Sequence, residues 1–295
     1  ISILKIMRDE GAFLDVVSSG EIYLALRSGF EPERILYTGT SVGEEELDYA
    51  IKSNVTINVD SLCQMEYLLG KTRPNLVSVR VNPEIGSGHH ERCVTGARDS
   101  KFGLLKEDAL RAYRMAREAG VERFGIQMHI GSGILNPEPY LEALENLLVT
   151  ARDVHKDTGI EFEFVDIGGG FGVPYRPEEH PLDLEKTGDR IIKLFKKRVS
   201  EYRLGEPVLC IEPGRFIVAD AGVLLTTVNS VKITPFKRFV GVDAGFNTLV
   251  RPCMYNAYHE ILLANTSRKA IGVMCDVVGP LCESGDFLAR ERKLE

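Results

Sequence analysis

The chain has 295 residues and a formal net charge of −7, and 44% of its residues are hydrophobic. This length suffices for one large domain, or for one domain and part of another. The net charge is acidic and the sequence gives no sign of the basic face of a nucleic-acid-binding protein, so no nucleic-acid partner is expected. The longest apolar stretch, residues 216–228, is short and interrupted by Asp220. We therefore expect no membrane span.

The six cysteines are scattered along the chain, at positions 63, 93, 210, 253, 275 and 282. None belongs to a Cys-x-x-Cys pair, so no zinc site is predicted. Scattered cysteines are typical of reduced thiols, and the expected location is the cytoplasm. No signal peptide is visible, although Ile1 is not an initiator methionine and an upstream segment is expected.

Short apolar runs alternate with longer segments of helical periodicity in the first part of the chain. The runs predict seven strands, at residues 13–17, 35–37, 56–59, 77–81, 125–130, 162–167 and 208–211. Helices are predicted between them, including residues 20–28, 44–52, 106–119, 139–155 and 188–202. This alternation indicates parallel strands joined by right-handed crossovers.

Seven strands fit either an open doubly wound sheet or part of a closed barrel, which needs eight. The distribution of chemically distinctive residues favours the barrel, because barrel active sites assemble at the carboxyl ends of several different strands. Such residues are Asp15, Arg80, His129, Gly168 and Glu212. We therefore expect an α/β fold with a (β/α)8 barrel whose first strand lies before Ile1.

The pattern changes after Gly222. Residues 223–231, 238–243 and 270–278 are predicted as strands with no long helices between them, which indicates an all-β second domain. The expected domains are therefore residues 1–222, the barrel, and residues 223–295, the β-domain. Because three strands would leave a poorly covered sheet, the β-domain is expected to be incomplete at its C-terminus.

Two of the strand-end motifs carry glycines beside polar groups. Gly168, Gly169 and Gly170 let the backbone approach an oxyanion and direct amides at it, although a tight turn without a ligand is the alternative. The ring of His129 could stack on a planar cofactor, and the hydroxyl of Ser132 could donate to a phosphate. The alternative for His129 is an ordinary core histidine.

The third motif reads Glu212-Pro213-Gly214-Arg215. A carboxylate at a strand end can pair with a pyridinium nitrogen and keep it protonated, as the chemistry of pyridoxal phosphate (PLP) requires. The alternative is a buried Glu–Arg ion pair. Together, the three motifs offer a flat ring, phosphate-binding groups and a carboxylate, which are the parts needed to hold PLP.

The second domain holds further candidates. Arg251 and Tyr255 are close enough in sequence to grip a carboxylate together. Cys282 stands beside Glu283 and could donate a proton, although an ordinary buried cysteine is the alternative. The loop at residues 82–90 contains two adjacent histidines that would point to opposite sides of a strand, so metal chelation is not expected there.

These motifs, in this order, resemble those of the diaminopimelate decarboxylases, a family with the PLP-binding barrel of the alanine-racemase type. The resemblance covers essentially the whole chain. It includes the segments Asp15-Val16-Val17-Ser18-Ser19-Gly20-Glu21, Arg80-Val81-Asn82-Pro83, Ser100-Lys101-Phe102-Gly103, Asp243-Ala244-Gly245-Phe246-Asn247 and Cys282-Glu283-Ser284-Gly285-Asp286, besides the three strand-end motifs.

The resemblance implies a role for each candidate residue. Glu212 would pair with the ring nitrogen of PLP and His129 would stack on the ring, while Cys282 would be the acid that protonates the carbon after carbon dioxide leaves. The phosphate would be held by Ser132, Gly168, Gly169, Gly170, Gly214 and Arg215. The carboxylates and amine of the substrate would be bound by Arg215, Arg251, Tyr255 and Glu283.

The resemblance also implies a reaction and a partner. The reaction is decarboxylation of meso-diaminopimelate to L-lysine, by a homodimer with shared active sites, because in this family the segment around Cys282 reaches the active site of the partner subunit. The family's PLP-binding lysine lies on the first barrel strand, which is expected before Ile1.

Two alternatives remain open at this point. A related decarboxylase for ornithine, arginine or carboxynorspermidine would share the barrel motifs, but Arg251, Tyr255 and Glu283 favour a substrate with a second carboxylate and a distal amine. A non-catalytic PLP-binding homologue is the other alternative, and the presence of Cys282 and Glu283 speaks against it.

Overall fold

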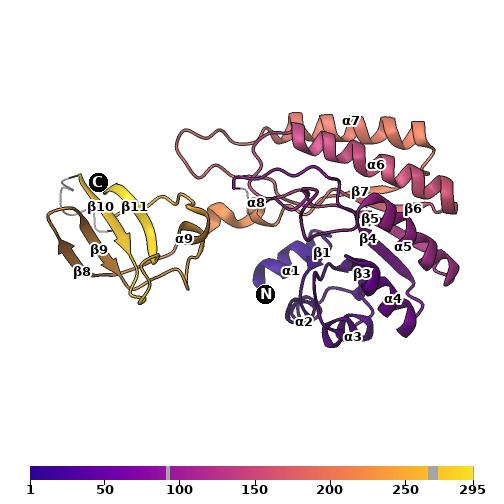
Figure 1. Ribbon diagram of the computed structural model, residues 1–295, viewed down its shortest axis with the longest axis horizontal. Coiled ribbons are helices and arrows are strands. Elements are labelled where there is room, and N and C mark those ends of the chain that lie inside the picture. Colours follow the sequence, from indigo (N-terminus) through magenta and orange to yellow (C-terminus); the bar gives the residue numbers. More distant parts are fainter. Residues whose placement is uncertain (91–93, 265–271, 295) are drawn as a thin grey trace. The chain divides into compact units, whose positions relative to one another are not determined.

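The structure, a computed structural model, describes residues 1–90, 94–264 and 272–294. It contains two compact units (Figure 1). The first unit comprises Ile1–Gly172 and Leu182–Ile217, and the second comprises Val173–Pro181 and Val218–Glu295. No sequence signal marks residues 173–181 as part of the second unit, and the boundary expected after Gly222 remains a prediction.

Seven parallel strands form the sheet of the first unit, and each strand pairs with the next one in chain order. A doubly wound sheet would reverse its order at a switch point, whereas a barrel does not. The expected parallel strands and barrel architecture are therefore confirmed. The strands are β1 (Leu14–Val16), β2 (Ile35–Tyr37), β3 (Thr56–Val59), β4 (Leu76–Arg80), β5 (Arg123–Gln127), β6 (Phe162–Asp166) and β7 (Val208–Cys210).

Helices connect these strands, and several begin at a polar capping residue. Ser18, Ser61 and Asp183 each accept a hydrogen bond from a backbone amide three residues later, which satisfies one of the amides that a helix start leaves unpaired. The helices of the first unit are α1 (Ser2–Asp9), α2 (Ser19–Arg27), α3 (Glu44–Lys52), α4 (Leu62–Lys71), α5 (Lys106–Glu118), α6 (Glu138–Thr158), α7 (Leu184–Tyr202) and α8 (Gly214–Val218).

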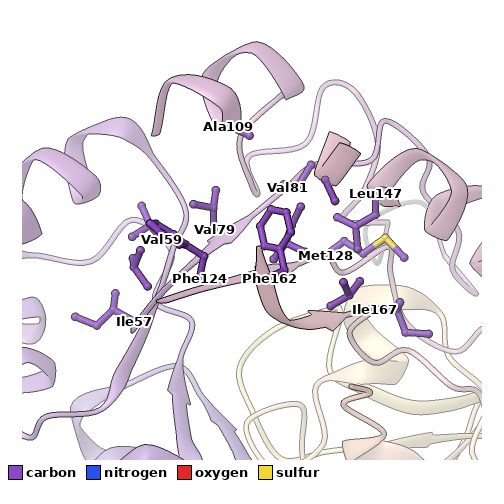
Figure 2. Close-up of a cluster of buried hydrophobic side chains, with 14 of the residues drawn as sticks. Ile57, Val59, Val79, Val81, Ala109, Phe124, Met128, Leu147, Phe162 and Ile167 are labelled. Carbon is purple, nitrogen blue, oxygen red and sulfur yellow. The ribbon is translucent and has the colours of Figure 1, made fainter. Parts of the chain in front are cut away.

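The main hydrophobic core lies between the sheet and its helices. Figure 2 shows Ile57, Val79 and Phe124 of neighbouring strands together with Ala109 of α5 and Leu147 of α6. Each of these five side chains is buried. Because strand side chains alternate between two faces, the residues between the apolar ones point to the opposite face of the sheet. That opposite face carries the polar residues described below.

The second unit is built on a four-stranded sheet in the order β11-β10-β9-β8. Strands β9 and β10 run parallel, and the two outer pairs are antiparallel. The strands are β8 (Val228–Ile233), β9 (Arg238–Val242), β10 (Val273–Val278) and β11 (Phe287–Leu294), and the short helix α9 (Arg251–Tyr255) lies between β9 and β10.

Three expectations for the second unit need adjustment. The strand expected at residues 223–231 begins only at Val228. The strand expected at residues 270–278 is seen from Val273, and Ala270 lies outside the described residues. Strand β11 was not expected at all, because its charged run Arg290-Glu291-Arg292-Lys293 hides the strand alternation.

Candidate active site

Polar side chains line the face of the first unit's sheet opposite the helices. Asn58, Ser78, Gln127 and Asp166 each follow or precede a buried apolar residue on a strand, and each is at most 5% exposed. Arg80 lies on the same face, at the end of β4, and is 7% exposed. Alternation in the strands therefore buries a polar layer behind the strand ends where the three motifs lie.

The glycine run draws the three motifs together. Gly168 and Gly170 have φ angles of 71° and 91°, a region that glycine enters without steric cost. A Cβ atom on Gly169 would overlap the backbone oxygen of Glu212, and one on Gly170 would overlap that of Gly131. The amide of Glu212 donates a 2.9 Å hydrogen bond to the oxygen of Gly168. The run is thus a close junction between neighbouring strand ends.

Two of the three glycine amides already have acceptors inside the protein. Gly168 N donates to Asp166 Oδ1 at 2.8 Å, and Gly169 N donates to His129 Nδ1 at 3.1 Å. Among the described residues, no acceptor faces the amide of Gly170. The amides of Gly168 and Gly169 are thus engaged within the protein, and phosphate binding by the three-residue run stays a prediction.

The ring of His129 is neutral in this environment. Its Nδ1 accepts the hydrogen bond from Gly169, which places the ring proton on Nε2. Burial, together with the positive charge of Arg80, lowers the pKa of His129 to about 4. A neutral, half-buried ring held at a fixed angle suits stacking against a planar group, as expected for His129.

Glu212 lies in a cluster of carboxyl groups. Its Oε1 accepts a 3.1 Å hydrogen bond from Gln127 Nε2. Burial, and then the charges of Asp166 and Asp15, raise the pKa of Glu212 well above its usual range. Burial likewise raises the pKa of Asp166 to about 6. Arg80 is the cation that faces both Asp15 and Glu212. The three carboxyl groups outnumber the one guanidinium, so the cluster can accommodate the charge of a further cation, such as a protonated pyridine.

The side chain of Arg215, in α8, has a buried nitrogen atom without a hydrogen-bond partner among the described residues. Its Nη1 is buried and makes no hydrogen bond with any described residue. Within the described part of the chain, the guanidinium that faces Glu212 is that of Arg80, so the alternative of a buried Glu–Arg ion pair stays open. A buried, unpaired guanidinium N–H fits an anion such as phosphate or carboxylate.

Ser132 and Gly214 complete the set of residues expected near the phosphate. The backbone oxygen of Ser132 accepts a 3.1 Å hydrogen bond from the amide of His89. This bond connects the loop with the paired histidines to the motif at residues 129–133. Gly214 is the first residue of α8 and directly precedes Arg215. The first unit thus brings together His129, the glycine run and Glu212 by direct contacts.

The other candidates lie in the second unit. Arg251 Nη1 is 2.9 Å from His259 Nε2, and the guanidinium stands 4.4 Å from the centre of the Tyr175 ring. Tyr255 ends the same helix, α9. Cys282 is exposed, so the alternative of an ordinary buried cysteine is wrong. Glu283, its neighbour, is also exposed.

The loop that carries Cys282 and Glu283 is anchored by Asp286. Asp286 is 3% exposed, and its two carboxylate oxygens accept hydrogen bonds from Phe246 N at 2.7 Å and Leu281 N at 2.9 Å. Neither this anchor nor the pair Asn58 and Gln127 was recognised from sequence. For Asn58 and Gln127, the available signal was a polar residue inside an apolar strand, which has many explanations, whereas Asp286 lies in the loop before β11.

Comparisons with known proteins agree with this geometry. A family model described as "Pyridoxal-dependent decarboxylase, pyridoxal binding domain" matches residues 1–219. A diaminopimelate decarboxylase of Methanothermobacter thermautotrophicus is 52% identical over 295 residues, covering 100% of this chain and 69% of the relative. One of Archaeoglobus fulgidus is 39% identical over 301 residues, covering 100% of this chain and 70% of the relative.

A solved structure shows the same fold. The crystal structure of diaminopimelate decarboxylase from Helicobacter pylori complexed with L-lysine has a TM-score of 0.88 and 33% identity, covering 100% of this chain and 73% of that one. The relatives and the solved structure therefore match the full length of the chain, and the family model matches residues 1–219. The chain belongs to the diaminopimelate decarboxylases, within the pyridoxal-dependent decarboxylases.

Proposed function

We propose that the protein is a PLP-dependent carboxy-lyase that converts meso-diaminopimelate to L-lysine, a step of lysine biosynthesis. The observation that carries the proposal is the junction of His129, Gly169 and Glu212 at neighbouring strand ends. It occurs in a chain that is 52% identical to a diaminopimelate decarboxylase. Bound PLP supplies an electron-withdrawing ring that stabilises negative charge on the carbon that loses its carboxylate.

The residues of the first unit would hold the cofactor. The neutral ring of His129 stacks on its flat face, and Glu212 accepts a hydrogen bond from its ring nitrogen. The Gly170 amide, the Ser132 hydroxyl and the Gly214-Arg215 turn bind its phosphate. The unpaired Nη1 of Arg215 and the excess of carboxyl groups around Glu212 support this assignment.

The residues of the second unit would serve the substrate. Arg251 and Tyr255 would bind a carboxylate, Glu283 would bind an amine, and Arg215 is a further candidate for a carboxylate. Cys282 delivers a proton to the carbon from which carbon dioxide has left. The exposure of Cys282 and Glu283 supports these roles, because both groups are accessible to a small molecule.

The direct test is lysine formation from meso-diaminopimelate with added PLP, using the protein made from its whole gene. Ornithine and arginine are assayed in parallel. Lysine from diaminopimelate alone supports the proposal. Turnover of ornithine or arginine instead would contradict the substrate assignment, and PLP binding without turnover would favour a non-catalytic homologue.

We further propose a cytoplasmic homodimer with shared active sites. The five described cysteines are free thiols, which is typical of a reducing compartment. In the described residues, no helix combines the length and apolarity that a membrane crossing requires. Mixing inactive Glu212→Gln with inactive Cys282→Ala tests the shared site. Partial recovery of lysine formation is expected, and no recovery after subunit exchange would contradict sharing.

A further inference from the structure

A chain of side-chain hydrogen bonds crosses the polar face of the first unit's sheet and ends on Glu212. Asn58 Nδ2 lies 3.1 Å from Gln127 Oε1, and Gln127 Nε2 lies 3.1 Å from Glu212 Oε1. Asn58 Nδ2 also donates to Thr38 Oγ1 at 3.3 Å, and Thr38 Oγ1 donates to Asp15 Oδ1 at 2.6 Å. This series of hydrogen bonds connects residues of β1, β3 and β5 with the end of β7.

The chemistry of these groups decides which group donates and which accepts in each of these hydrogen bonds. Burial raises the pKa of Asp15 to about 7, and above that pH the single proton of Thr38 is directed at the Asp15 carboxylate, so the Thr38 oxygen accepts from Asn58. Asn58 therefore presents its amino group to both neighbours, and Gln127 must turn its carbonyl oxygen towards Asn58. Only the amino group of Gln127 remains to face Glu212.

We propose that Gln127 is a positioning residue for Glu212, and that Asn58 acts through Gln127 by fixing the orientation of its amide. Gln127 then presents an N–H donor to Glu212, which stabilises the carboxylate as an anion and holds it in one orientation. The inference rests on the proposed role of Glu212 as the partner of the cofactor's ring nitrogen. Gln127 and Asn58 are each 1% exposed, so water offers no replacement donor.

The surroundings of Glu212 explain why such a donor matters. Its ionisable neighbours are Asp15 from β1, Arg80 from β4, Asp166 from β6 and Cys210 from β7. The charges of Asp166 and Asp15 favour a protonated Glu212, Arg80 favours the anion, and the Cys210 thiol is neutral because burial raises its pKa. A neutral donor with a fixed orientation stabilises the anion without adding a second positive charge that would repel a protonated pyridine.

Gln127→Met tests the proposal, because methionine has a similar shape and no N–H donor. We expect the acidic limb of the kcat pH profile to move to higher pH by about one unit, with KM little changed, since a lost hydrogen bond to a charged group is worth about a tenfold change. The absorbance of the bound cofactor should titrate at a correspondingly changed pH. Ser78→Ala is the matched control. Ser78 is equally buried, pairs in register with Asn58 and has a hydroxyl without a partner.

A second measurement on cofactor-free protein keeps this inference separate from the proposed reaction. The urea midpoint of Gln127→Met should fall further below wild type at pH 8 than at pH 5, because only the ionised Glu212 needs the donor. Asn58→Ala should act in the same direction, and adding it to Gln127→Met should cause no further pH-dependent change. A loss of equal size at both pH values, or additive pH-dependent effects, would overturn the proposal even if the enzyme makes lysine.

Discussion

The amide of Gly169 donates a 3.1 Å hydrogen bond to Nδ1 of His129, which joins the end of β6 to the end of β5. This contact does two things at once. It occupies Nδ1 and so keeps the imidazole in one neutral tautomer, and it sets the angle of the ring. The ring that we propose to stack on PLP is thereby held by the same glycine run that approaches Glu212.

Two substitutions of His129 distinguish the contribution of its ring from that of its hydrogen bond with Gly169. His129→Ala loses both, whereas His129→Phe keeps a flat ring but leaves the Gly169 amide without its acceptor. We expect PLP affinity to fall by about two- to tenfold in the alanine variant and by less in the phenylalanine variant, since ring stacking is worth about 0.5–1.5 kcal/mol. Fluorescence titration with PLP measures both. Equal losses in the two variants would show that the ring itself contributes nothing.

Gly169 should tolerate no side chain. Gly169→Ala would drive a Cβ atom into the backbone oxygen of Glu212, and we expect a loss of stability of about 2 kcal/mol or more together with weakened PLP binding. Gly188→Ala, in α7, is the control, because nothing lies within 4 Å of its Cβ position. That change should stabilise the protein by up to about 1 kcal/mol. Urea unfolding of both variants measures the contrast, and similar effects would contradict the close junction.

The strand-end motifs were predictable from sequence because glycine, histidine and Glu-Pro-Gly-Arg interrupt apolar runs at regular places. The layer behind them was not. Gln127 and Asn58 are single polar residues in short strands, and only the pairing of the strands brings them within hydrogen-bonding distance. Strand β11 was missed for a related reason, since its outward residues are charged and its inward residues Leu288 and Ala289 are adjacent at its start.

Asp166 should make the cofactor-free protein less stable as the pH rises. Its pKa is raised by burial to about 6 in the folded protein, from an ordinary value of about 3.9. The folded state therefore holds more protons between these values, and stability falls as the pH rises from about 4 to 6. Asp166→Asn keeps an oxygen for the Gly168 amide and removes the charge. We expect it to gain up to about 3 kcal/mol at pH 7.5 and little at pH 4.

Asp276 should change the stability of the protein with pH in the direction opposite to that of Asp166. Burial tends to raise its pKa, but hydrogen bonds from the Glu291 amide and Lys237 outweigh burial and lower it. This carboxylate stabilises the folded state above its unfolded pKa, and the stabilisation is lost as the pH falls. Asp276→Asn should therefore lose stability at pH 7.5 and less at pH 4. Parallel pH trends for the two variants, measured by urea unfolding, would contradict the assignment.

Asp286 should control the loop that carries Cys282. Without its carboxylate, the amides of Phe246 and Leu281 lose their acceptors, and each lost hydrogen bond costs about 1–3 kcal/mol. We expect hydrogen exchange of these two amides to accelerate about tenfold or more in Asp286→Ala, and lysine formation to fall. Asp276→Ala, which removes an equally buried carboxylate, should accelerate exchange at Glu291 and leave Phe246 and Leu281 protected. Uniform acceleration across β10 and β11 would indicate general destabilisation instead.

Cys282 should be needed for turnover and not for binding. Its thiol is exposed, and its proposed task is to deliver one proton to the substrate carbon after carbon dioxide leaves. A positioned acid of this kind contributes about 100-fold or more, so Cys282→Ala should lower kcat by about that factor while KM changes little. Cys63→Ala, which removes an exposed thiol on α4, is the control and should leave kcat unchanged. Lysine release measures both. If Cys282→Ala matches wild type, another group supplies the proton, and the role assigned to Cys282 is wrong.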